Sequence, residues 1–125
     1  MSMGVRWMDG QYVNLGMSDA RFTELLADEL HAQLVQLSAA CERIVVFMHH
    51  LPFAELVPQG RPDRFAFAAA FMGAARFGEV LRAFPKISHV FCGHSHWRSQ
   101  IRVGNMDVLA IGSTYLDKRL EILDI

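Results

Sequence analysis

Cysteine is scarce in this chain. Its two thiols, Cys41 and Cys92, lie far apart in the sequence, and neither belongs to a closely spaced pair. This excludes the disulfide frameworks of small secreted domains and the cysteine pairs of zinc fingers. We therefore expect a reducing, cytoplasmic environment and a fold that depends on a hydrophobic core. With 125 residues the chain is long enough to bury one core, so residues 1–125 are expected to form a single domain.

An excess of basic residues is missing as well. The chain has 12 lysines and arginines against 13 aspartates and glutamates, which gives a formal net charge of −1. Proteins that bind nucleic acids usually carry a strong basic excess on one surface, because the phosphate backbone dominates their affinity. The composition therefore argues against a nucleic-acid platform.

Long hydrophobic runs are also absent. The longest apolar stretch, FAFAAAFMGAA at residues 65–75, has about half the length that a membrane-spanning helix requires. The opening residues MSMGVRWMDG lack the basic stretch and apolar segment of a secretory signal. We therefore expect a soluble protein with no membrane partner.

The sequence does contain helical and strand patterns in alternation. Ser18 can cap a helix over residues 19–39, whose apolar residues recur every three or four positions at Phe22, Leu26, Leu30, Leu34 and Leu37. RIVVFM at 43–48 and KISHVFCG at 86–93 are continuous apolar runs, as expected for strands that are covered on both faces. Between them, residues 64–84 read as a helix that is interrupted near Gly73 or Gly78.

The remaining segments predict turns, a loop and further strands. Residues 4–15 suggest a short hairpin or an irregular extended segment, and the proline-rich residues 49–63 suggest a loop over the end of the first strand. Residues 98–114 form two alternating runs around Gly104-Asn105, and residues 119–125 complete a third strand of that antiparallel group. We therefore predict an α/β protein, with α+β as the alternative.

Four histidines follow directly after the two apolar strands. His49 and His50 come after the first strand, and His94 and His96 come after the second, with Gly93 available to bend the backbone. Strand ends are where layered α/β sheets hold ligands, and neutral imidazoles bind zinc, manganese and iron. An isolated His-x-His pair is more often structural, but two such groups favour a metal site.

These paired motifs resemble the C-terminal half of the calcineurin-like metallophosphoesterases. VVFMHHLPF, followed later by VFCGHSHW, carries the resemblance, which covers residues 43–115. It implies part of a layered β-sandwich flanked by helices, and hydrolysis of phosphate esters by two divalent ions of manganese, iron or zinc. It also implies that His49 and His94 ligate one ion and His96 the other. His50 would be a substrate-side catalytic group, and which of His49 and His50 is the ligand stays open.

The family's N-terminal motifs are missing. Asp-x-His, Gly-Asp-x-x-Asp and Gly-Asn-His with an acidic residue do not occur, and GNMD at 104–107 is assigned to a hairpin turn. Without carboxylates an ion would bind weakly. We therefore expect either a phosphatase or phosphodiesterase half site that depends on a homodimer or a partner chain, or an inactive, truncated fragment that acts through oligomerisation or interaction.

Overall fold

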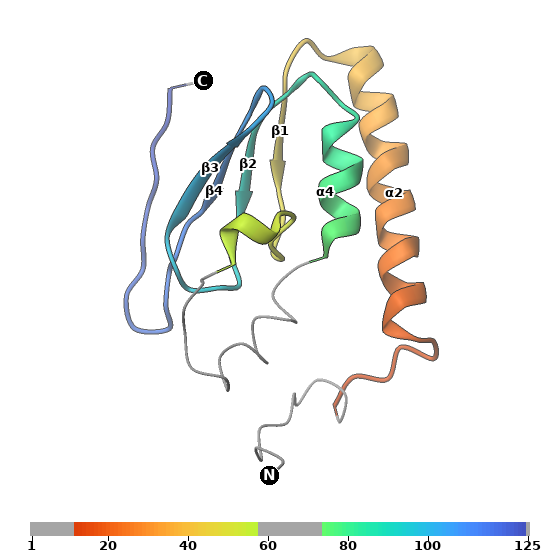
Figure 1. Ribbon diagram of the computed structural model, residues 1–125, viewed down its shortest axis with the longest axis horizontal. Helices are drawn as coiled ribbons and strands as arrows, with labels where there is room; N and C mark the ends of the chain where they lie inside the picture. Colours follow the sequence, from red (N-terminus) through yellow and green to blue (C-terminus); the bar gives the residue numbers. More distant parts are fainter. Residues whose placement is uncertain (1–11, 58–73, 125) are drawn as a thin grey trace.

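The computed structural model of the protein describes residues 12–57 and 74–124, which form two helices packed on a four-stranded sheet (Figure 1). The elements are α2 (Asp19–Ala40), β1 (Ile44–Phe47), the 3₁₀ turn η1 (Ala54–Leu56), α4 (Ala75–Arg82), β2 (Ile87–Cys92), β3 (Ser99–Val103) and β4 (Met106–Ala110). The strand order is β1-β2-β4-β3, in which β2 pairs parallel with both β1 and β4, and β3 pairs antiparallel with β4. The predicted α/β class is confirmed.

Helix α2 begins and ends close to the predicted residues. The Ser18 side chain caps it by accepting a hydrogen bond from the Arg21 backbone N–H at 3.3 Å. Its buried stripe is formed by Ala27, Leu30 and Leu34, so two of the expected core positions, Leu26 and Leu37, are exposed instead.

Helix α4 runs through Gly78 without a break, so of the two positions predicted for an interruption, Gly78 is wrong, and Gly73 lies outside the described residues. A side chain at Gly78 would overlap the Pro52 carbonyl oxygen and lie 2.9 Å from the Phe53 ring. The glycine thus serves close packing between the helix and the segment after β1 and does not end the helix. Residues 64–73 of the predicted helix and residues 4–11 of the predicted hairpin lie outside the described part of the chain.

The hydrophobic core lies between the helices and one face of the sheet. Val46, Val90 and Val108 are register partners on three adjacent strands, and all three are buried. They belong to one cluster with Leu34 of α2 and Leu81 of α4. Partners in register point to the same side of a sheet, so these residues define the face that the helices cover.

The opposite face of the sheet is exposed at the edge strand β1, whereas Leu109 on the inner strand β4 is buried. Phe47, Phe91, Leu109 and Gln100 are register partners on this face, and the Phe47 side chain is 75% exposed. Figure 1 shows α2 and α4 on one side of the strands and the C-terminal segment on the other. Sheets with parallel strands are usually covered on both faces, so this exposure is unusual.

The predicted hairpin around Gly104 is confirmed, since Gly104 takes a positive φ of 56° in the turn between β3 and β4. The predicted antiparallel grouping holds for this hairpin only, because β4 pairs parallel with β2. The strand expected at 119–125 is not formed over residues 119–124, which are extended but pair with no strand. Within the described residues, no helix is long and apolar enough to cross a membrane.

Candidate functional site at the carboxyl edge of the sheet

Parallel pairing brings the carboxyl ends of β1 and β2 to one edge of the sheet. The backbone contacts continue past the strands: the Met48 N–H donates to the Phe91 carbonyl at 2.9 Å, and the Gly93 N–H donates to the His49 carbonyl at 3.1 Å. These two hydrogen bonds hold the start of each histidine segment against the other. The side chains that follow β1 and β2 therefore lie close together because backbone hydrogen bonds join the two segments.

The rings of His49, His50 and His94 gather at this edge. His49 Nε2 lies 3.0 Å from His94 Nδ1, which is hydrogen-bond distance. The His50 ring centroid is 5.3 Å from that of His49 and 4.9 Å from that of His94. His49 and His50 are exposed, and His94 is half-buried. Because a hydrogen bond between imidazoles needs one donor and one acceptor, at least one ring of the His49/His94 pair is neutral.

The bend behind β2 is made by the histidines themselves. His94 and His96 have positive φ angles of 62° and 55°, whereas Gly93, which was expected to make the bend, does not. Residues other than glycine adopt this left-handed conformation rarely, and it is concentrated at functional sites. Ser95 anchors the bend between them, since its backbone N–H donates to the Gly93 carbonyl at 2.7 Å.

Gly112, which follows β4, supports the histidine loop from the neighbouring strand. The Ile111 N–H donates to the Cys92 carbonyl at 3.0 Å, so β4 continues alongside the end of β2. Gly112 has a φ of 74°, and a side chain there would overlap the Arg98 backbone, 2.8 Å from its Cα. No role was predicted for Gly112; the signal available in the sequence was a glycine just after an apolar strand.

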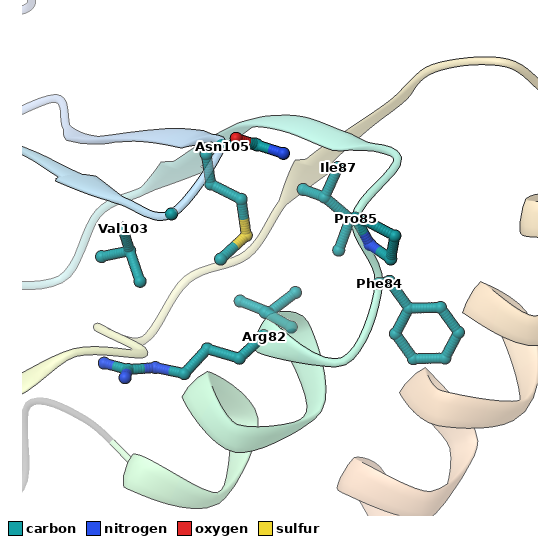
Figure 2. Close-up of a pocket in the computed structure, with 9 residues that line it drawn as sticks. Arg82, Phe84, Pro85, Ile87, Val103 and Asn105 are labelled. Atoms are coloured by element: carbon teal, nitrogen blue, oxygen red, sulfur yellow. The ribbon is translucent and has the colours of Figure 1, made fainter.

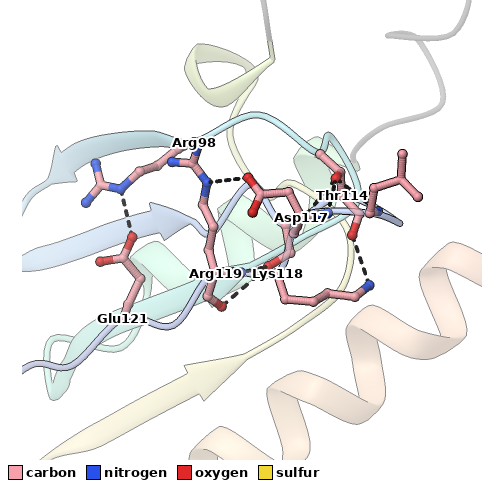
Figure 3. Close-up of polar contacts among 8 residues, drawn as sticks. Arg98, Thr114, Asp117, Lys118, Arg119 and Glu121 are labelled. Carbon is pink, nitrogen blue, oxygen red and sulfur yellow. Dashed lines mark hydrogen bonds and ion pairs between the residues drawn. The ribbon is translucent and has the colours of Figure 1, made fainter.

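His96 contacts the segment after β4. Its ring packs edge-on against Tyr115, with the centroids 4.9 Å apart. No role was predicted for Tyr115, yet a compact turn holds it in place: Thr114 Oγ1 accepts from the Asp117 N–H at 2.8 Å, and the Thr114 carbonyl accepts from Lys118 Nζ at 2.9 Å (Figure 3). His94 thus contacts His49, whereas His96 contacts Tyr115.

An ion pair joins Arg98, which precedes β3, to Glu121 in the C-terminal segment. Arg98 Nε lies 2.7 Å from a Glu121 carboxylate oxygen (Figure 3). The hydrogen bond from Arg98 lowers the pKa of Glu121, and the same bond raises the pKa of Arg98. Arg98 is thereby engaged with the C-terminal segment, which it fastens to the start of β3.

The donor set at the edge fits a partial metal site. Two nitrogens that bind one ion at about 2.1 Å, with an angle of about 90° between the bonds, are about 3.0 Å apart. The separation of His49 Nε2 and His94 Nδ1 has this value. Over residues 12–57 and 74–124, however, no group of three or more histidine, cysteine, aspartate or glutamate side chains could hold an ion. The described residues thus bring two imidazole nitrogens together, without the carboxylates that a complete metal centre would need.

The Cys92 thiol and a cavity beside the β3/β4 turn are not part of this site. Burial raises the pKa of Cys92 to about 11, so its thiol is protonated at neutral pH and unsuited to bind metal. A cavity of about 380 Å³, lined by Phe84, Ile87 and Asn105 among others, lies at the opposite end of the sheet (Figure 2). Asn105 belongs to the hairpin turn beside this cavity, as predicted for the GNMD segment.

Comparison with known proteins identifies no relative: no family model, curated protein or solved structure matches this chain.

Proposed function

We propose that this chain provides the histidine half of a metal-dependent phosphoesterase site at the carboxyl edge of its sheet. The observation that carries the proposal is the 3.0 Å separation of His49 Nε2 and His94 Nδ1, two side chains delivered by adjacent parallel strands. The HHLP and GHSH segments predicted this convergence. The left-handed backbone at His94 and His96 supports it further, because such strain is retained mainly where a side chain must be aimed.

Each histidine has a separate task in this proposal. His49 and His94 hold one divalent ion of manganese, iron or zinc, and His96 contributes to a second. His50, exposed and beside both ligands, donates a hydrogen bond to the phosphate of the substrate. Bound ions would supply charge neutralisation and activation of water for hydrolysis of a phosphate ester.

The proposal includes a second polypeptide that supplies carboxylates. Imidazoles are neutral ligands, and the charge of a dication is offset only when carboxylates join them. The described residues offer no such group at the site. We therefore assign weak metal binding and little turnover to the isolated chain, and full activity to an assembly with a carboxylate-bearing partner.

A second candidate function is an interaction module without catalysis. The exposed Phe47 ring at the end of the edge strand β1 favours it, because an exposed aromatic side chain of this kind is suited to association. In this case the histidine pair is a structural hydrogen bond that ties the ends of β1 and β2 together.

Metal titration separates the two candidates. We expect Co²⁺ added to the full chain to give a visible absorption band with nitrogen ligands, and His49→Ala and His94→Gly each to weaken binding at least tenfold. Glycine is chosen at position 94 because it accepts the positive φ without strain. His31→Gln is the matched control, since His31 lies on α2 against Phe84 and outside the site. Equal Co²⁺ binding by all four proteins would refute the metal assignment.

Turnover is then tested with a generic aryl phosphodiester and added Mn²⁺. The proposal expects a rate above background that falls when His94 is replaced by glycine and is unchanged in His31→Gln. A chain that binds Co²⁺ through His49 and His94 but shows no turnover would place activity in the assembly with a partner. The absence of both Co²⁺ binding and turnover would favour the interaction module.

A further inference from the structure

We propose that the cavity beside the β3/β4 turn binds a small molecule with an apolar body and one carboxylate group. The cavity lies between the end of α4 and the hairpin turn, where β2 and β4 begin (Figure 2). His49 and His94 stand at the other end of the sheet and do not line it. The proposal therefore does not depend on metal binding by the histidines.

The buried part of the cavity lining is apolar. Leu81 lies in the last turn of α4, Phe84 follows that helix, and Ile87 and Met106 begin β2 and β4. All four side chains belong to the hydrophobic core, yet each of them borders the cavity. The volume of about 380 Å³ is within the range of sites for small ligands. A short aliphatic or aromatic body would gain free energy by leaving water for such a surface.

Arg82 is the charged residue of this lining. Its guanidinium carbon lies 5.0 Å from the centre of the Phe53 ring, and Figure 2 shows its side chain running from α4 toward Val103. Within residues 12–57 and 74–124, Arg82 forms no ion pair with a carboxylate. Four other arginines each pair with a carboxylate of the same chain: Arg76, Arg98, Arg102 and Arg119. A guanidinium that rests on a ring keeps its in-plane N–H donors available to a ligand.

The charges around the cavity favour a carboxylate over a phosphate. One guanidinium matches the single charge of a carboxylate, whose two oxygens it can bind together. A phosphate monoester carries about 1.5 to 2 negative charges at neutral pH, so it would need further cations. Lys86 is engaged elsewhere, because its Nζ donates to the carbonyls of Ser38 and Cys41 at 2.6 and 3.0 Å. Asn105, the other polar side chain of the lining, offers an uncharged amide donor.

The test is an NMR titration of the ¹⁵N-labelled full chain with hexanoate. We expect saturable shifts of the Gly104, Asn105 and Met106 amide signals, with a dissociation constant on the order of 1 mM, and no shift at His49. Acetate lacks the apolar body and hexanol lacks the charge, so each should bind about tenfold more weakly or worse. These two probes separate the proposed site from general anion binding and from general apolar adsorption.

Variants of two exposed arginines assign the binding to this cavity. Arg82→Gln should weaken hexanoate binding about tenfold or more and leave hexanol binding unchanged. Arg21→Gln is the matched control, because Arg21 is exposed in the first turn of α2 and does not line the cavity. It should leave the dissociation constant unchanged, and circular dichroism should show that both variants are folded.

Three results would overturn the proposal. The first is the absence of saturable shifts at the hairpin turn with hexanoate up to about 50 mM, far above the expected dissociation constant. The second is hexanol binding as tight as hexanoate binding, which would remove the role of the carboxylate. The third is an equal loss of affinity in Arg21→Gln and Arg82→Gln. The comparison of hexanoate, acetate and hexanol uses the unchanged chain, so it decides the ligand class even where a variant fails to fold.

Discussion

His94 Nδ1 lies 3.0 Å from His49 Nε2, although the two residues are 45 positions apart in the sequence. The contact exists because β1 and β2 run parallel and the hydrogen bond from Gly93 to the His49 carbonyl continues their pairing beyond the strands. A pair of imidazoles placed in this way can share a proton or an ion. Substitutions can test the backbone features that hold this pair and its surroundings in place.

The conformation of His94 predicts how substitutions there affect stability. Residue 94 has a φ of 62°, a left-handed conformation that is strained for alanine but not for glycine. The free energy of unfolding of His94→Ala should therefore be about 1 kcal/mol lower than that of His94→Gly. Both variants lose the contact with His49, so the difference isolates backbone strain. Urea unfolding followed by circular dichroism measures it. If alanine proved as stable as glycine, the left-handed conformation of residue 94 would be contradicted.

Gly112 should be intolerant of any side chain. In Gly112→Ala the new Cβ would meet the Arg98 backbone at a positive φ, and we expect a loss of about 3 kcal/mol or more together with displacement of the histidine loop. Gly104→Ala is the control, because Gly104 also has a positive φ but has no atom within 4 Å of an added Cβ. It should cost only about 1 kcal/mol. Thermal unfolding of both variants decides the comparison.

The two thiols should differ in reactivity. Burial raises the pKa of Cys92 to about 11, so at pH 8 roughly one Cys92 in a thousand is a thiolate. Cys41 is only half-buried at the end of α2. We expect one thiol per chain to react rapidly with Ellman's reagent and the second to react only in urea. Cys41→Ser should remove the rapid phase, and a rapid phase that survived this change would show that Cys92 is accessible.

The attachment of the C-terminal segment should depend on pH. The pKa of Glu121 is lowered by its hydrogen bond with Arg98, so the ion pair contributes fully above the ordinary glutamate pKa and is lost as the pH falls through the lower, folded-state value. An NMR titration should therefore place the Glu121 inflection below the usual glutamate range. In Arg98→Gln we expect it to return to that range, with faster hydrogen exchange over residues 119–124.

The local elements were predictable because their signals are local. Ser18 followed by an apolar residue every three or four positions identified α2, and Gly104-Asn105 between alternating runs identified the β3/β4 turn. Residues 119–124 carry a strand-like pattern too, but they pair with no strand, and the pattern holds no information about which neighbour the segment meets. For the same reason Gly78, which resembled a helix breaker, proved to be a packing residue beneath Pro52.

The amino-acid sequence by itself determined that two histidine groups follow two buried strands, because strand and loop patterns are short-range properties of composition. Only the tertiary structure decided that the two strands pair parallel, that His49 contacts His94 while His96 contacts Tyr115, and that Phe47 is exposed on an edge strand. Those relationships arise from contacts between segments distant along the chain, and such contacts are fixed when the whole core packs.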